Sequence, residues 1–247
     1  MTALLLPPSA SEGEAEAIFD QIVEACRSLE VTLVGGHTEV TAGLERPIVV
    51  GCMLGEVQKG KEVSAAGGKP GDSLMLTKGI AIEGTALLAR DAPERLRSAG
   101  VPAETIEKAA AFLFSPGISV ARDAAIACAS VRINAMHDPT EGGLATGLWE
   151  LARASGTGLE VWEERIPVLP ECQRIAQALG LDPLGLLASG ALLMAVPKDQ
   201  VPPLVAGLKA QGIDCREIGR LTPPDQGMWM VTRRGRVPLP RFERDEL

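Results

Sequence analysis

The stretch AMHDPTEGGLATGLWELARASG, residues 135–156, gives the clearest structural pattern in the sequence. Its first residues predict a short strand, the Asp-Pro-Thr-Glu-Gly-Gly segment predicts a loop, and the periodic apolar residues that follow predict a helix closed by Gly156. Such a loop presents backbone N–H groups and the positive end of the helix dipole, an arrangement suited to phosphate. The stretch therefore predicts a strand–loop–helix unit of a layered domain with a candidate anion site.

The polar residues of this loop have two interpretations. Asp138 could hold Mg²⁺, which prefers one or two carboxylates together with phosphate oxygens. Alternatively, Thr140 is a helix N-cap and Asp138 forms the turn. The functional interpretation is favoured, because a cap needs one such residue and not His, Asp, Thr, Glu and two glycines together.

Two further motifs carry candidate functional residues. In Gly35-Gly36-His37-Thr38-Glu39, which we expect where a buried strand over 31–36 ends, His37 and Glu39 offer a proton carrier or metal ligand. Taken alone, this motif favours a tight turn, because Gly-Gly pairs commonly mark turns. In Thr77-Lys78-Gly79, Lys78 could contact a phosphate, although this motif alone is a weak signal.

The remaining chain predicts α/β (α+β layered) architecture, with strands alternating with amphipathic helices. Residues 58–72 are rich in glycine and lysine and are the best domain boundary. The expected strands cover 31–36, 47–57, 73–79, 133–138, 159–164, 190–196 and 214–222. The expected helices cover 14–29 with a Ser11–Glu14 capping box, 83–90, 103–114, 116–130, 144–156 and part of 197–212.

Composition excludes several classes of protein. The 247 residues carry a net charge of −8 and no tyrosine, which argues against a nucleic-acid partner. No apolar run approaches the roughly 18 residues of a membrane helix, and the start lacks the features of a signal peptide. The five cysteines are widely spaced and predict buried thiols of a reducing cytoplasm rather than a disulfide framework or zinc site.

Five segments together resemble the aminoimidazole ribonucleotide (AIR) synthase superfamily, most closely its HypE-like hydrogenase-maturation members and the AIR synthase-related proteins beside them. The segments are LVGGHTEVTAG (33–43), PGDSLMLTKGIAIEGTALLA (70–89), AMHDPTEGGLATGLWELARASG (135–156), LASGALLMAVP (187–197) and IGRLT (218–222). The resemblance covers roughly residues 3–222.

The resemblance implies a fold and an activity. It implies part of an AIR synthase-like N-terminal domain over residues 1–57, which dimerises through its sheet, and a complete C-terminal domain over 58–247, with the nucleotide in the cleft between them. The implied activity uses Mg-ATP to phosphorylate the oxygen of an amide or carboxamide in a small-molecule or carboxamide substrate.

The resemblance also implies roles for individual residues. Asp138 would bind Mg²⁺, and His37, Glu39 and His137 would supply acid or base groups. ATP contacts are expected from Gly35, Gly36, Thr38, Lys78, Thr140, Gly142 and Gly143.

The ATP-dependent enzyme is the leading hypothesis, but the sequence departs from the family in two ways, and the first of them motivates an alternative. The chain is expected to lack the preceding half-domain, which carries the nucleotide lid and the main metal-binding Asp residues, and it ends in FERDEL rather than in a cysteine. The resemblance implies that HypE-like members form a thiocyanate on a C-terminal cysteine, so we do not expect that reaction on this chain. Because the nucleotide lid is expected to be missing, enzymatic activity would need a lid supplied from elsewhere. The alternative is a non-catalytic scaffold that acts as a homodimer or with a separately encoded N-terminal part.

Overall fold

The computed structural model describes residues 1–247, which form two compact units, Met1–Glu62 and Val63–Leu247. Both units mix helices with strands, as the α/β prediction required. No helix in the structure combines the length and the apolar composition that a bilayer crossing requires.

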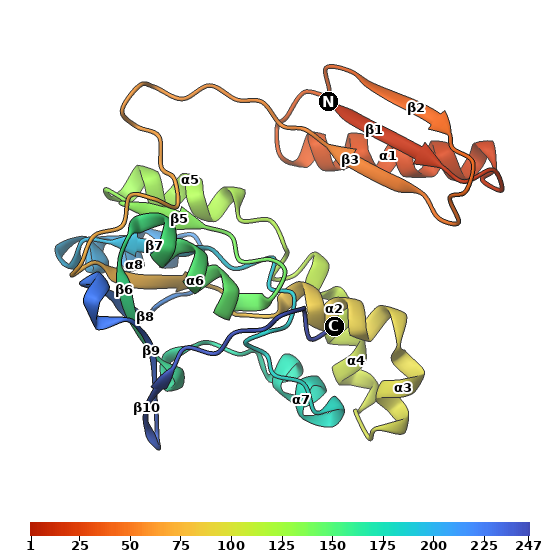
Figure 1. The fold of residues 1–247 in the computed structure, drawn as a ribbon. Coiled ribbons are helices and arrows are strands. Elements are labelled where there is room, and N and C mark those ends of the chain that lie inside the picture. Colours follow the sequence, from red (N-terminus) through yellow and green to blue (C-terminus); the bar gives the residue numbers. More distant parts are fainter. The chain divides into compact units, whose positions relative to one another are not determined.

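The first unit is a three-stranded sheet with one helix (Figure 1). Its elements are β1 (Thr2–Leu6), α1 (Glu12–Ser28), β2 (Gly36–Val40) and β3 (Ile48–Gly51). The central strand β1 pairs in parallel with β2 and antiparallel with β3. The predicted capping box is confirmed, since the Ser11 side chain accepts a hydrogen bond from the Glu14 N–H and the Glu14 side chain accepts one from the Ser11 N–H.

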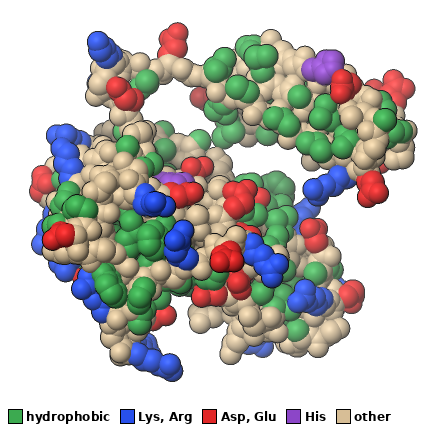
Figure 2. All heavy atoms as spheres, viewed as in Figure 1, with side chains coloured by type: hydrophobic (Ala, Val, Ile, Leu, Met, Phe, Trp, Pro, Cys, Tyr) green, Lys and Arg blue, Asp and Glu red, His purple; other side chains and the backbone are tan.

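The first unit encloses very little apolar material. Leu4 and Leu6 of β1 are buried, whereas α1 has no buried residue and every residue of β2 and β3 is exposed. Hydrophobic side chains consequently cover much of its surface (Figure 2). This unit leaves apolar area for which it has no internal partner.

The sequence-based prediction for the second strand of this unit was wrong. Residues 31–35 are not in a strand, and the strand is Gly36–Val40, of which only Gly36 belonged to the predicted strand over 31–36. The cause is pairing with β1, a strand that was not predicted: Gly36 lies opposite Thr2, and a Cβ at Gly36 would collide with the Thr2 carbonyl. The glycine motif therefore starts an exposed strand and does not end a buried one.

The second unit is built on a seven-stranded sheet in the order β10-β9-β6-β8-β4-β7-β5. Its strands are β4 (Ser73–Thr77), β5 (Ala135–His137), β6 (Gly158–Trp162), β7 (Leu193–Val196), β8 (Cys215–Thr222), β9 (Met228–Thr232) and β10 (Gly235–Pro238). Every pairing is antiparallel except that of β6 with β9.

Helices cover both faces of this sheet (Figure 1). Alternate residues of β4 point to opposite sides, because side chains alternate along a strand. Leu74 and Leu76 pack in the cluster that contains Leu148 of α6 (Gly143–Ser155). Met75 packs in the cluster that contains Leu204 of α8 (Val201–Ala210), beside α5 (Ala121–Ser130). The sheet is thus the middle of three layers.

The remaining helices form a smaller cluster of their own around buried Leu96, Ile106 and Ile175. They are α2 (Ile82–Asp91), α3 (Pro93–Ser98), α4 (Ala103–Ala110) and α7 (Pro170–Leu179). Short 3-10 turns lie at Ala111–Leu113, Glu163–Arg165, Lys198–Gln200 and Pro224–Gln226.

Three further expectations need correction. The fifth helix begins at Ala121 rather than at residue 116, and α3, α7, β9 and β10 were not predicted. All five cysteines are free, but Cys52 and Cys128 are exposed, so the thiols are not uniformly buried. The missed strands β9 and β10 form an antiparallel hairpin at one edge of the sheet.

Candidate functional site

The Gly-rich loop, residues 138–143, connects β5 to α6 and includes the first residue of that helix. Strand β5 lies at one edge of the seven-stranded sheet, and α6 packs on a face of that sheet. Gly142 and Gly143 both have left-handed backbones, with φ of +72° and +68°. A Cβ at Gly143 would collide with the Leu184 carbonyl, and one at Gly142 would collide with the Thr146 side chain. Glycine is therefore required at both positions for the chain to turn from β5 into α6.

The N-terminus of α6 is formed by Gly142 and not by Thr140. Gly142 is the N-cap residue, and no side chain of the loop caps the helix. The Thr140 carbonyl instead accepts hydrogen bonds from the N–H groups of Gly143, at 3.1 Å, and Ala188, at 3.1 Å. The interpretation of Thr140 as a plain N-cap is therefore wrong. Thr140 ties the loop to the segment that precedes β7.

A carboxylate lies on this loop. The Gly142 N–H donates to Oδ2 of Asp245 at 3.0 Å, and the Leu187 N–H donates to Oδ1 of the same side chain at 3.2 Å. Two backbone donors from segments 45 residues apart, at 142 and 187, thus converge on one anionic group. The loop has the donor geometry of an anion site, and in this structure the occupant is the chain's own carboxylate.

His137 ends β5 and lies between two carboxylates. Its Nε2 is 2.8 Å from Oε2 of Glu150 on α6, and its Nδ1 is 3.9 Å from Oδ1 of Asp138. The His137 side chain is 19% exposed and the Asp138 side chain 68% exposed. Glu150 therefore orients a partly buried imidazole, while Asp138 projects into solvent where it could meet a metal ion.

The ionisable side chains within the loop, Asp138 and Glu141, are both acidic. Glu141 accepts hydrogen bonds from the Thr140 hydroxyl and from the Glu141 backbone N–H, and these bonds hold the pKa of Glu141 below its usual value. No group of three His, Cys, Asp or Glu side chains in the structure could hold a metal ion. Asp138 can supply one carboxylate, which fits Mg²⁺ only if phosphate oxygens complete its shell.

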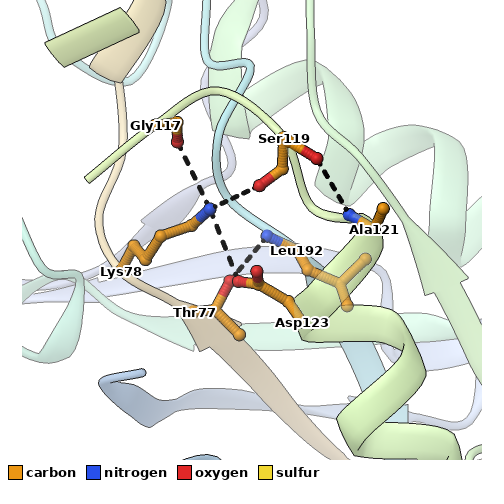
Figure 3. Close-up of polar contacts among 7 residues, drawn as sticks. All are labelled: Thr77, Lys78, Gly117, Ser119, Ala121, Asp123 and Leu192. Carbon is orange, nitrogen blue, oxygen red and sulfur yellow. Dashed lines mark hydrogen bonds and ion pairs between the residues drawn. The ribbon is translucent and has the colours of Figure 1, made fainter. Parts of the chain in front are cut away.

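Lys78 contacts Asp123 of α5 and the segment that precedes this helix, as Figure 3 shows. Its Nζ donates to the carbonyls of Ser119, at 2.9 Å, and Gly117, at 3.3 Å, and lies 3.5 Å from Oδ1 of buried Asp123. Burial lowers the pKa of Lys78, and the charge of Asp123 opposes that shift. In this structure the ammonium holds the segment before α5, and its contact with a phosphate stays a prediction.

Lys78 also lies at the edge of a cavity of about 630 Å³ in the second unit. Its lining includes Arg216 and Arg233 together with Glu163, Glu164 and Asp214. The two signs of charge are mixed there, so the cavity does not have the uniformly positive lining that would attract a polyphosphate.

The motif Gly35-Gly36-His37-Thr38-Glu39 lies in the first unit. Nε2 of His37 is 3.0 Å from Oε2 of Glu39, and the Thr41 hydroxyl donates to Oε1 at 2.9 Å. The hydrogen bond from His37, followed by that from Thr41, lowers the pKa of Glu39. Both side chains of the pair are well exposed, at 67% and 49%, on an edge strand.

The predicted site residues other than Lys78 thus fall into two sets, one in each unit. His137, Asp138, Thr140, Gly142 and Gly143 form one continuous site in the second unit. Gly35, Gly36, His37, Thr38 and Glu39 are adjacent to one another in the first unit. The role of each as an ATP, metal or proton-transfer residue stays a prediction.

Sequence reasoning missed Asp245 and Leu187 altogether. The segment containing Leu187 was quoted only as part of the family resemblance, and the acidic tail only for its missing cysteine. Asp245 and Gly142 are 103 positions apart, and no local pattern links them.

Comparison with known families matches both parts of the chain. Residues 69–229 match the family described as AIR synthase related protein, C-terminal domain, and residues 1–57 match the corresponding N-terminal domain. A putative hydrogenase expression/formation protein of Methanocaldococcus jannaschii is 30% identical over 236 residues, which are 95% of this chain and 67% of that protein. The carbamoyl dehydratase HypE of Cupriavidus necator is 28% identical over 85% of this chain, which spans only 57% of that relative.

Solved structures show the same fold. Escherichia coli HypE superposes with a TM-score of 0.82 at 20% identity, covering 100% of this chain and 74% of its own. A hydrogenase maturation protein HypE in complex with ATP gives a TM-score of 0.72 at 21% identity, covering 98% of this chain and 72% of its own. With both family domains matched in order along residues 1–229, the chain belongs to the AIR synthase related family and is similar to HypE-type hydrogenase maturation proteins.

Proposed function

We propose that the protein binds Mg-ATP at the Gly-rich loop and uses it to phosphorylate the oxygen of an amide or carboxamide. One observation carries the proposal: the N–H groups of Gly142 and Leu187 converge on a carboxylate, and a phosphate group needs the same donors. The relatives support it, because one is named a carbamoyl dehydratase and one structural relative is a complex with ATP.

Each residue of the loop has a part in this proposal. Gly142 and Gly143 let the backbone approach the phosphates, and Thr140 fixes the loop against the segment before β7. Asp138 is the exposed carboxylate that would share Mg²⁺ with phosphate oxygens. His137 is the candidate acid or base, oriented by Glu150. Lys78 and the motif of the first unit remain candidates for further ATP contacts.

The chemistry follows from the charge that the site can stabilise. The amide oxygen attacks the γ-phosphorus, the bond to the β-phosphate oxygen breaks, and ADP leaves. The phosphorylated oxygen is then a good leaving group for cyclisation or dehydration. Backbone N–H groups aimed at the transferring phosphoryl group, with a divalent cation, stabilise its charge in the transition state.

Calorimetric titration of Mg-ATP into the 247-residue chain tests the proposal. We expect binding in the wild type, loss of binding when Mg²⁺ is removed by chelation, and at least about tenfold weaker binding for Asp138→Ala, equivalent to about 1.4 kcal/mol. Asp225→Ala, an exposed aspartate of the same unit with no ion pair, is the matched control. Equal affinity in Asp138→Ala and Asp225→Ala contradicts the metal assignment.

A second candidate function is that of a cytoplasmic scaffold, in which the first unit pairs with a second copy or with a separately encoded N-terminal part. The supporting observation is the exposure of Ile48, Val49 and Val50 on an edge strand, at 38%, 47% and 55%. Exposed edges and apolar patches of this kind favour association. Light scattering tests it: we expect a dimer that Val50→Asp dissociates, whereas Val237→Asp in the second unit leaves it intact.

A further inference from the structure

The last nine residues, 239–247, form a strap over the second unit, and the strap is anchored at its start. Leu239 is 3% exposed in the main core, and its N–H donates to the Met228 carbonyl at 3.1 Å. The indole N–H of Trp149 on α6 donates to the Pro240 carbonyl at 3.2 Å, and the Arg241 guanidinium lies 5.0 Å from the centre of the Trp149 ring. The strap therefore starts from a fixed point beside α6.

The distal part of the strap contacts the segment that supplies the second anion donor. Phe242 lies against Gly185, where a Cβ would collide with its ring. The Glu246 N–H donates to the Gly185 carbonyl at 3.2 Å, and its side chain accepts from the Asp182 N–H at 3.3 Å. These contacts place Asp245, between them, on the N–H groups of Gly142 and Leu187.

The contact of Asp245 differs from an ordinary surface hydrogen bond in its two donors. Its two oxygens accept from two separate segments, one of which is the uncapped N-terminus of the 13-residue helix α6. A carboxylate there is favoured by the helix dipole as well as by the hydrogen bonds. A phosphate oxygen would use the same N–H groups, so the two anions exclude each other.

We propose that the strap is an internal competitor for the anion site, in which Asp245 holds the place of a phosphate and an incoming anionic ligand must displace it. This inference rests on the proposed function for the identity of the ligand. The strap lies beyond residue 229, where the match to the family's C-terminal domain ends. Its near end stays fixed through Leu239, and only the part after Arg241 has to move.

The competition has a measurable size. If the strap is docked in about nine of ten molecules, only about one tenth of the molecules can bind the anion, and the apparent Kd is about ten times the intrinsic Kd. Removing the Asp245 carboxylate should then strengthen the apparent affinity about tenfold. Asp245→Ala removes the competing group. Glu243→Ala removes one negative charge from an exposed strap residue without a hydrogen bond or ion pair, and is the matched control.

The experiment is an NMR titration of the full chain with inorganic tripolyphosphate, following the backbone amides of Gly142 and Leu187. We expect both amides to shift in the wild type, about tenfold tighter binding in Asp245→Ala, and unchanged binding in Glu243→Ala. At saturation in the wild type, the amides of Glu246 and Leu247 should sharpen and move to random-coil positions as the strap is released.

The outcomes separate the two proposals. Tripolyphosphate that binds wild type and Asp245→Ala equally, with Gly142 shifted in both, overturns the competition and leaves the anion site standing. No shift of Gly142 or Leu187 in either protein overturns both. If Asp245→Ala does not fold, the wild-type titration decides, because a strap that stays docked when the site is saturated contradicts displacement.

Discussion

The first unit leaves most of its apolar side chains exposed, whereas the second encloses a continuous core on both faces of its sheet. In the first unit the only buried apolar side chains are Leu4, Leu6 and Pro7, and the 17-residue helix α1 has none. In the second, Leu74, Leu76 and Leu148 are each fully buried. Since buried apolar area supplies about 25 cal/mol per Å², the second unit stabilises itself and the first depends on further surface for its stability.

The largest effect that separates the two units should come from their ion pairs. In Lys78→Met the Asp123 carboxylate stays buried without its cation, and we expect the free energy of unfolding to fall by about 3–5 kcal/mol. Arg27→Met breaks an exposed pair with Glu24 in α1 and should cost less than about 1 kcal/mol. Urea unfolding followed by circular dichroism measures both.

Adding Asp123→Asn to Lys78→Met checks the cause of this effect. The second substitution removes the uncompensated charge and should restore part of the lost stability. Equal losses in Lys78→Met and Arg27→Met would contradict the contrast between the units.

A leucine truncation tests the cores directly. Leu148 is fully buried and Leu54 is 80% exposed, so the same change to alanine samples the two environments. We expect Leu148→Ala to lower the free energy of unfolding by about 2–5 kcal/mol, because it leaves a cavity beneath α6. Leu54→Ala should change it by no more than about 0.5 kcal/mol, again by urea unfolding. A large cost for Leu54→Ala would show that this side chain has a partner in solution.

A smaller effect is expected from the capping box of α1. Because α1 has no buried side chain, its cap contributes a large share of its stability. Ser11→Ala should cost about 1 kcal/mol and speed hydrogen exchange of the α1 amides about fivefold. Ser9→Ala, an exposed serine just outside the helix, is the control. Unchanged exchange in Ser11→Ala would mean that another surface holds the helix.

The smallest effect concerns the titration of Glu39. Its folded-state pKa is lowered, chiefly by the hydrogen bond with His37, so the stabilisation it brings is present above its ordinary pKa of 4.5 and is lost as the pH falls through the lowered value. Carboxyl NMR titration should give a pKa below 4.5 in the wild type and a higher one in His37→Ala. A pKa that does not move would show that Thr41 alone holds the carboxylate.

The sequence predicted those parts of the fold whose signals are local. The strand–loop–helix unit around Gly142 and the capped helix α1 have apolar periodicity and terminal residues that act within a few positions. The register of β2 depends on parallel pairing with β1, a contact across 34 positions, and the prediction there was wrong. Helix α7 was missed, although Pro170 at its start and Cys172, Ile175 and Ala176 on one face were signals that could have found it.

For the candidate site, too, the local features could be predicted from the sequence and the long-range contacts could not. The residues of the Gly-rich loop are consecutive, so their proximity could be predicted, as could the need for glycine at the turn. The second donor at Leu187 and the carboxylate of Asp245 reach the loop only through the packing of the sheet, α6 and the strap. Long-range contacts of single residues leave no periodic pattern, and the structure was needed to find them.

The contact between the strap and Trp149 has a spectroscopic consequence. The three tryptophans, at positions 149, 162 and 229, all belong to the second unit, and the chain has no tyrosine. Emission excited at the red edge of the indole band therefore reports on the second unit alone. Trp149 donates to the strap backbone, so in a chain that keeps only this indole, its wavelength and quenching would change with the solvation of residues 240–241. The protein thus carries a built-in optical probe of its own C-terminus.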